Sequence, residues 1–268
     1  MSQEVLRGCD HVRLGRVAAV AVGPAALALS RGGADKPYAY YQPNEDCTGF
    51  ASGDGGTLIA VGDAHKGWEA SHVAIDVLLQ RHGAAWTAAA ALGEPWPELA
   101  ARAAAEVHAE VLRQGMARDG NPDSRTTLVF ALVRPADDLV AWGSIGDSHV
   151  FVAGPDAAEE ITGTPDPPRW FVGSAEREPG EIAERLRTGT RPRNEKRAVV
   201  LASDGLSELN IGVANPAAAV AEAVQRAAAA GPELRPLEAA RGLVETAQEA
   251  HRANNAGDNM AAAVVWLD

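Results

Sequence analysis

The sequence predicts an α+β fold in which antiparallel sheets are flanked by pairs of helices. One observation is the order of the expected elements: strands, two helices, strands, a long irregular segment, one strand, two helices and a last strand. Because helices come in pairs and do not alternate with single strands, a doubly wound parallel sheet is disfavoured. The other observation is that 268 residues with 46% hydrophobic content are enough for one large core. No Pro/Gly/Ser-rich linker divides the chain, so we expect a single domain over residues 1–268.

Short apolar runs and helical spacings define the expected elements of the first half. Residues 17–22 and 25–29 predict two strands joined at Gly23-Pro24, and residues 57–61 predict a short buried strand. Apolar residues then recur at helical spacing over 68–82. An Ala-rich stretch over 97–117 predicts a second helix with high propensity but a weak apolar face.

The second half returns to strands before its own pair of helices. Strands are expected over 126–133 and 139–142 around a turn at 135–138, over 150–153, and from Glu160-Ile161. Residues 162–196 are rich in Pro, Gly and Arg and predict an irregular, flap-like segment with room for a short helix over 180–186. A strand over 198–202, helices over 216–230 and 236–252 that each open with Pro, and a strand over 260–267 complete the chain.

Charge and composition exclude several classes of partner. The formal net charge of −12 argues against nucleic acid and against an anionic membrane surface. The apolar stretch 17–29 is too short to span a bilayer, and no cleavage signal follows it. Cys9 and Cys47 have neither a Cys-x-x-Cys nor a zinc spacing, which favours two thiols in a reducing compartment. We therefore expect a cytoplasmic monomer.

Aspartates at the ends of apolar runs are the most informative feature. Asp63 and Asp204 each follow such a run, Asp258 precedes the last one, and Asn44-Glu45-Asp46 lies near the start. A carboxylate at a strand end is costly unless water, a cap or a cation satisfies it. Each position alone is more often a turn. Together they predict a carboxylate cage for a hard divalent cation.

Six short motifs extend this pattern. They are Asn44-Glu45-Asp46, Gly62-Asp63-Ala64-His65-Lys66-Gly67, Ser124-Arg125-Thr126-Thr127-Leu128, Gly146-Asp147-Ser148-His149, Ala202-Ser203-Asp204-Gly205-Leu206 and Gly257-Asp258-Asn259-Met260. In this order they resemble the protein phosphatase 2C family of metal-dependent Ser/Thr phosphatases. The resemblance implies two antiparallel sheets sandwiched between helix pairs in four layers, α-β-β-α. It also implies hydrolysis of phosphoserine or phosphothreonine in proteins by a metal-activated water.

The resemblance also implies metal ligands. Asp63 is expected to bridge two Mg²⁺ or Mn²⁺ ions, with the carbonyl of Ala64 as a further ligand. Asp204 and Asp258 fall on positions that hold one of the two ions. Two such cations lower the pKa of a bound water and offset the charge of the phosphoryl oxygens.

Further site residues follow from the same resemblance. Asp46, with Glu45 beside it, is expected to bind the metals directly or through their waters. Asp147 corresponds to a ligand of a weaker third ion, shared with Asp204, although Gly-Asp-Ser is also a good turn. His65 matches a histidine that protonates the leaving alcohol, a role suited to its near-neutral pKa. The alternative for His65 is that it only orients a ligand or water.

The chain departs from the family pattern at the expected phosphate-binding arginine. Tyr41 stands at that position and lacks the charge and fork of a guanidinium. Arg31, Lys36, Lys66 and Arg125 are the candidate substitutes, and Lys66 is equally well explained as an exposed turn residue.

The departure leaves two alternatives open. One is a catalytically weak phosphatase-fold module that binds phosphoprotein or a partner, and the other is a hydrolase of small phosphorylated metabolites. We also expect segment 162–196 to pack beside the metal site and shape substrate choice.

Overall fold

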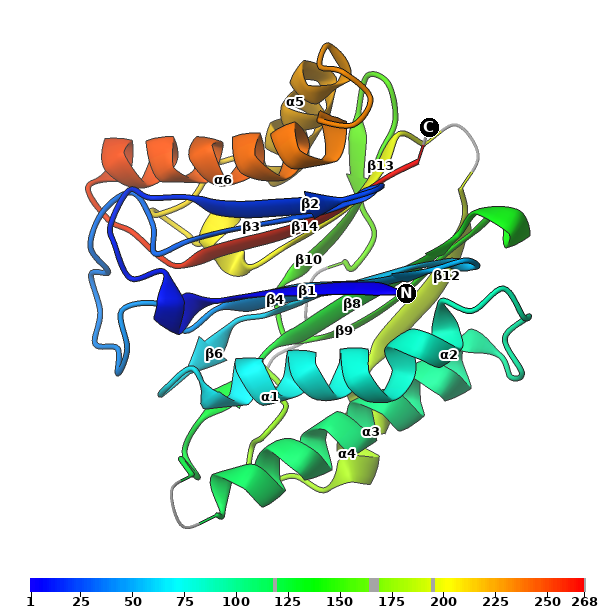
Figure 1. Ribbon diagram of the computed structural model, residues 1–268. Helices are drawn as coiled ribbons and strands as arrows, with labels where there is room; N and C mark the ends of the chain where they lie inside the picture. The colour runs from blue at the N-terminus through cyan, green and yellow to red at the C-terminus, as the bar shows by residue number, and fades with distance from the viewer. Residues whose placement is uncertain (118–119, 164–168, 194–195, 268) are drawn as a thin grey trace.

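Two antiparallel sheets lie face to face with helices on both outer sides in the computed structural model of the chain (Figure 1). The structure describes residues 1–117, 120–163, 169–193 and 196–267. The first sheet has the strand order β1 (Ser2–Arg7), β4 (Cys47–Gly53), β5 (Gly56–Gly62), β8 (Leu128–Arg134), β9 (Leu139–Ile145), β12 (Arg187–Pro192). The second has the order β11 (Ala158–Glu160), β10 (His149–Ala153), β13 (Ala198–Ala202), β14 (Met260–Trp266), β3 (Ala25–Ser30), β2 (Ala18–Val22).

Helices cover the outer face of each sheet. Helices α1 (Glu69–Leu78) and α3 (Trp96–Gly115) lie on the first sheet, and α5 (Pro216–Ala228) and α6 (Arg235–Asn254) lie on the second (Figure 1). A π-helical turn (Leu79–Gly83) connects α1 to the short α2 (Ala84–Trp86), and α4 (Pro179–Arg185) packs on α3. The α+β fold and its four layers are therefore confirmed.

Strand alternation divides the apolar side chains between an inner and two outer cores. In β5, Ile59 and Val61 face the second sheet, whereas Leu58 and Ala60 face α1 and α3. Successive strand residues point to opposite faces, so a strand covered on both sides is apolar throughout. This burial explains why β5 and β14 appear in the sequence as continuous apolar runs.

Several strand predictions need correction. The strand expected to start at Glu160-Ile161 is β11, which ends at Glu160, and β6 (Ala64–His65) was not expected. β1 and β4 were not expected, and they pair with each other along the edge of the first sheet. The segment 162–196 is not irregular throughout, because it contains α4 and β12, which pairs with β9. Arg-Thr-Gly-Thr-Arg-Pro has no apolar alternation, so its pairing partner and not its own pattern makes it a strand. Positions 164–168 and 194–195 of this segment lie outside the described residues.

Two expectations about the chain can be compared directly with the structure. Cys9 and Cys47 are both free thiols. Within the described residues, every helix is too short or too polar to cross a bilayer.

Candidate functional site

The strand ends that carry the predicted carboxylates meet at one end of the sandwich. Asp46 and Asp63 flank the paired ends of β4 and β5 in the first sheet. Asp204 and Asp258 flank the paired ends of β13 and β14 in the second. The Ser203 hydroxyl donates to Asp46 Oδ2 at 2.8 Å and joins the two sheets. Two aspartates from each sheet thus converge, and each is at most 8% exposed.

Burial places these carboxylates in strong mutual repulsion. Burial, then the charges of Asp46 and Asp258, raise the pKa of Asp63 well above its ordinary value. Burial and then Asp63 and Asp258 likewise raise the pKa of Asp204. Burial raises the pKa of Asp46 to about 7, although the Lys36 ammonium opposes this shift. Close buried carboxylates disfavour each other's ionised form unless a cation compensates their charge.

The unpaired oxygens of the cluster fit a hard divalent cation. Asp46 Oδ1 and Asp147 Oδ1 are buried and accept no hydrogen bond within the described part of the chain, whereas Asp147 Oδ2 forms an ion pair with Arg169. Carboxylate oxygens are the ligands that Mg²⁺ and Mn²⁺ prefer. In their present geometry, however, the described residues do not form a closed group of three metal-binding side chains. The chain's own polar groups already engage some of these oxygens.

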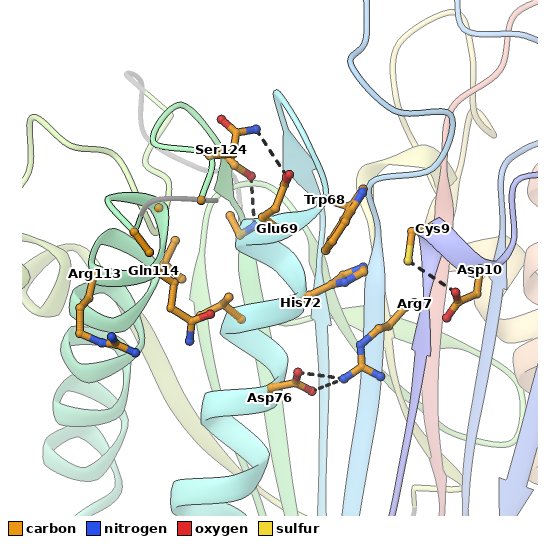
Figure 2. Close-up of a pocket in the computed structure, with 17 residues that line it drawn as sticks. Arg7, Cys9, Asp10, Trp68, Glu69, His72, Asp76, Arg113, Gln114 and Ser124 are labelled. Atoms are coloured by element: carbon orange, nitrogen blue, oxygen red, sulfur yellow. Dashed lines mark hydrogen bonds and ion pairs between the residues drawn. The ribbon is translucent and has the colours of Figure 1, made fainter.

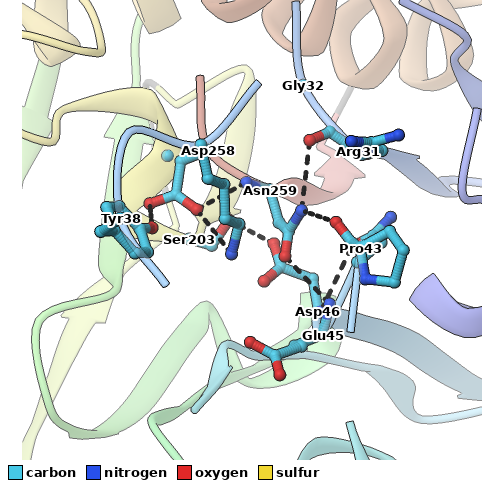
Figure 3. A network of polar contacts seen from close by, with 12 residues as sticks. Arg31, Gly32, Tyr38, Pro43, Glu45, Asp46, Ser203, Asp258 and Asn259 are labelled. Atoms are coloured by element: carbon cyan, nitrogen blue, oxygen red, sulfur yellow. Dashed lines mark hydrogen bonds and ion pairs between the residues drawn. The ribbon is translucent and has the colours of Figure 1, made fainter. Parts of the chain in front are cut away.

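Two residues of the loop between β3 and β4, Lys36 and Tyr38, contact the Asp258 carboxylate. Figure 3 shows Tyr38 beside Asp258. Lys36 Nζ lies 2.9 Å from Asp258 Oδ1, and the Tyr38 hydroxyl donates to Asp258 Oδ2 at 2.5 Å. Burial lowers the pKa of Lys36, but Asp258, Asp63 and Asp46 leave it above its ordinary value. Burial and the charge of Asp258 raise the pKa of Tyr38. Lys36 is therefore an ammonium ion inside the carboxylate cluster.

Asn259 fixes the course of this loop (Figure 3). Its Oδ1 accepts from the Glu45 backbone N–H at 2.9 Å, and its Nδ2 donates to the carbonyls of Arg31 and Pro43 at 3.1 and 2.9 Å. The Glu45 carboxylate accepts from the Gly67 N–H at 2.7 Å. Glu45 thus holds the turn after Asp63, and burial raises its pKa.

His65 lies on the short strand β6 (Ala64–His65), which pairs with β7 (Arg125–Thr126). Register places His65 opposite Arg125, and the Phe171 ring lies edge-on to His65 with centroids 4.9 Å apart. The Arg125 guanidinium lies 5.1 Å from the centre of the same ring. Burial lowers the pKa of His65. Phe171 belongs to segment 162–196, so part of that segment does lie beside the site.

Asp147 follows β9 through Gly146, whose φ of 93° favours glycine. The Arg169 guanidinium lies 2.9 Å from Asp147 Oδ2, so a second residue of segment 162–196 reaches the site. The charge of Asp147 contributes to the raised pKa of Asp204.

The five candidates for the phosphate-binding position are distributed unevenly. Tyr41 is 62% exposed, and Arg31 pairs with Asp35 at 2.6 Å. Lys66 is exposed, with a left-handed φ of 62°. Lys36 lies among the carboxylates and Arg125 beside His65. Lys36 contacts a carboxylate of the cluster with its side chain, and Arg125 is paired with His65. Arg31 and Tyr41 reach Asn259 and Glu45 through their backbones.

Sequence reasoning gave no role to Tyr38, Ser203, Asn259 or Phe171. Ser203 and Asn259 were part of the matched motifs, and a polar residue next to a strand-end Asp was the available signal. Tyr38 and Phe171 lie in stretches without periodicity and carry no such signal. Tyr38 contacts Asp258, which lies 220 positions away in the sequence, and Phe171 contacts His65. The local sequence around Tyr38 and Phe171 indicates neither contact.

A cavity of about 910 Å³ lies next to this site, between α1, α3 and the end of β1 (Figure 2). Trp68, which follows Gly67, stacks on His72 with ring centroids 4.4 Å apart. Arg7 donates to both oxygens of Asp76 across the cavity wall. Burial lowers the pKa of His72 to about 4, so His72 is neutral at physiological pH.

Comparisons with known proteins identify the family and the fold of the chain. The family model described as protein phosphatase 2C matches residues 38–248. No curated protein matches the chain. Among solved structures, the serine/threonine phosphatase Stp1 from Staphylococcus aureus is 17% identical, with 92% of this chain and 96% of that chain covered and a TM-score of 0.66.

Two further structures show the same fold. The catalytic domain of the serine threonine protein phosphatase PstP in complex with two manganese ions is 19% identical, with 94% and 100% of the two chains covered and a TM-score of 0.63. PstP/Ppp from Mycobacterium tuberculosis is 20% identical, with 94% and 98% covered and a TM-score of 0.63. The family match spans more than half of the sequence and confirms the resemblance carried by the six motifs. The chain belongs to the protein phosphatase 2C family.

Proposed function

We propose that this protein is a metal-dependent phosphatase that removes phosphate from phosphoserine and phosphothreonine in proteins, and that residues 1–268 form one catalytic domain. The convergence of two buried aspartates from each sheet carries the proposal. The family match supports phosphoprotein as the substrate class. Neither that match nor any described contact favours a purely binding module or a metabolite hydrolase. The monomeric state and cytoplasmic location stay predictions.

Asp46, Asp63, Asp204 and Asp258 would hold Mg²⁺ or Mn²⁺, since all four are buried oxygen donors. The two manganese ions in the solved PstP domain support two ions here. Asp147 would be a ligand of a third ion, a role that rests on the family resemblance alone. When bound, such ions supply a nucleophilic water of lowered pKa and neutralise phosphoryl charge.

Other chain groups would position these ligands. The carbonyl of Ala64 would complete the set, and Glu45 would act through metal-bound water while it anchors Gly67. The Thr127 hydroxyl accepts from the Asp63 N–H at 3.1 Å, and the Thr127 N–H donates to the Asp63 carbonyl at 2.9 Å. These two bonds fix the backbone that presents Asp63 and Ala64.

Arg125 and His65 would act on the substrate. The Arg125 guanidinium lies beside His65, and its buried Nε has no hydrogen-bond partner among the described residues, so the guanidinium would bind a phosphate oxygen there. We assign Arg125 to the role of the arginine that Tyr41 replaces. His65 would act as an imidazolium that gives a ring proton to the leaving alkoxide and returns to neutral imidazole, and its lowered pKa makes the imidazolium the minor form at neutral pH. His65→Gln should therefore slow phosphopeptide hydrolysis more than p-nitrophenyl phosphate hydrolysis, because p-nitrophenolate leaves without protonation.

Segment 162–196 would contact the substrate beside the phosphate. Phe171 against His65 and Arg169 against Asp147 support this placement. Phe171→Ala should change the ranking of phosphopeptides more than the turnover of the small aryl phosphate. Equal effects on both substrates would mean that Phe171 is only structural.

The function is tested by a hydrolysis panel of phosphoserine peptides, phosphothreonine peptides, small phosphorylated metabolites and p-nitrophenyl phosphate. Activity should vanish in EDTA and return with Mn²⁺ or Mg²⁺. Asp63→Asn should remove it, whereas Asp54→Asn, at an exposed turn, should not. Turnover that persists in excess chelator would contradict the mechanism, and turnover confined to metabolites would contradict the substrate class.

A further inference from the structure

Asp258 has both of its carboxylate oxygens engaged by the chain itself (Figure 3). Oδ1 lies 2.9 Å from Lys36 Nζ and accepts from the Asn259 N–H at 2.7 Å. Oδ2 accepts from the Tyr38 hydroxyl at 2.5 Å. The Lys36 and Asp258 side chains are only 7% and 9% exposed, so bulk water does not screen this ion pair. A residue expected to hold a metal ion is therefore already neutralised.

The ammonium also acts on the other carboxylates of the cluster. Asp46, Asp63 and Asp204 are buried beside Asp258, so the charge of Lys36 lies among four carboxylates that come from both sheets. A divalent cation and an ammonium ion cannot share Asp258 Oδ1 without strong repulsion in so buried a place. Binding of a metal ion at Asp258 must therefore move the Lys36 ammonium away from this carboxylate.

The loop offers the ammonium a path outward. Residues 37–41 are exposed, and the Lys36 ammonium is carried by a flexible stem of four carbons. The rings of Tyr38 and Tyr40 lie 5.4 and 5.9 Å from Lys36 Nζ, within the range of cation–π attraction. Lys36 can therefore leave Asp258 and still keep a favourable contact nearer the surface.

We propose that Lys36 is an internal cation that competes with the metal ion for Asp258, with Tyr38 as its partner in the same loop. This inference rests on the proposed metal centre. In the absence of metal, Lys36 and Tyr38 stabilise the carboxylate cluster. Metal binding displaces Lys36 from Asp258, so Lys36 weakens the affinity for the ion held there and sets the metal concentration at which the site fills.

The test measures Mn²⁺ binding by calorimetry with the full chain. Lys36→Met keeps the apolar stem and removes the charge. It should therefore lower the Kd of the metal ion that Asp258 binds at least about tenfold. The control is Lys196→Met, which makes the same change in net charge just before β13, at the end of that strand opposite Asp204. It should leave each Kd within about twofold. Both variants should bind the same number of ions as the wild type.

Two further measurements cover the case in which Lys36→Met fails to fold. Tyr38→Phe removes one hydrogen bond from Asp258 and should lower the same Kd, by a smaller factor. Lys36, Lys66 and Lys196 are all the lysines of the chain, so the ¹⁵N signals of the ammonium groups are easily assigned. Saturating Mg²⁺ should convert the Lys36 signal from slow to fast exchange with water and leave the Lys196 signal unchanged.

The outcomes separate this inference from the proposed function. If the wild type binds no Mn²⁺ or Mg²⁺, the metal centre itself is wrong. If the wild type binds metal but Lys36→Met and Tyr38→Phe bind it no more tightly, competition is wrong. An ion count that rises in Lys36→Met would mean that Lys36 replaces an ion permanently, and an unchanged Lys36 signal in Mg²⁺ would mean that it is not displaced. Either result overturns the proposal.

Discussion

Asn259 is predicted to be a main structural support of the candidate metal site. The side chain is 2% exposed and makes three hydrogen bonds, to the Glu45 N–H and to the carbonyls of Arg31 and Pro43. A neutral hydrogen bond contributes about 1 kcal/mol net. The Glu45 N–H is buried and would lose its partner entirely in Asn259→Ala. We therefore expect this variant to lower the free energy of unfolding by about 3 kcal/mol.

The assay is urea unfolding followed by tryptophan fluorescence, in EDTA so that metal binding does not contribute. The matched control is Asn254→Ala, which removes a bond of 2.9 Å to the Ile211 carbonyl at the exposed end of α6. Asn259→Ala should also weaken Mn²⁺ binding, because Asn259 holds the Glu45-Asp46 backbone against β14. If Asn259→Ala destabilised the protein no more than Asn254→Ala does, the support role would be refuted.

Three further predictions concern the wider structure. The folded pKa of His72 is about 4 against an ordinary 6.5, so the unfolded chain is protonated first as pH falls. The free energy of unfolding should thus drop by up to about 3 kcal/mol between pH 6.5 and 4. This loss should be absent in His72→Phe, which retains the stacking on Trp68, and equal pH curves for the two proteins would contradict it. Arg134, 2% exposed, donates to three backbone carbonyls near α2, and Arg134→Met should cost about 3–5 kcal/mol in urea unfolding. In Gly205→Ala the new Cβ would meet the Asn259 carbonyl oxygen at 1.8 Å, so stability should fall by about 1–3 kcal/mol. If either variant unfolded at the same urea concentration as the wild type, the close contacts of Arg134 or Gly205 would not stabilise the fold.

The fold could be predicted from the sequence where burial imposes a regular pattern. β5, β13 and β14 are covered on both faces and are therefore apolar throughout, and α5 and α6 open with Pro in the first turn. β12 could not be predicted this way, since its residues are exposed or only partly buried and its pairing with β9 decides its structure. Strand pairing across a sheet leaves little trace in the sequence of an edge strand.

Some residues of the candidate site could also be predicted from the sequence, and others could not. A strand-end aspartate is costly unless a hydrogen bond or a cation satisfies its carboxylate. Asp63, Asp204 and Asp258 could therefore be predicted as metal-site residues from the sequence. Lys36 was only one of several basic residues, because nothing local indicates that an irregular loop will carry it to Asp258. Its contact spans most of the chain and depends on the pairing of β3 with β14.

We propose that the converging aspartates would together hold two divalent ions and that Asp63 would be required for both. Calorimetric titration of the full chain with Mn²⁺ tests it most directly. We expect two ions bound per chain in the wild type and in Asp54→Asn, and the loss of two-ion binding in Asp63→Asn with the fold retained. Two Mn²⁺ ions bound with undiminished affinity by Asp63→Asn would contradict it.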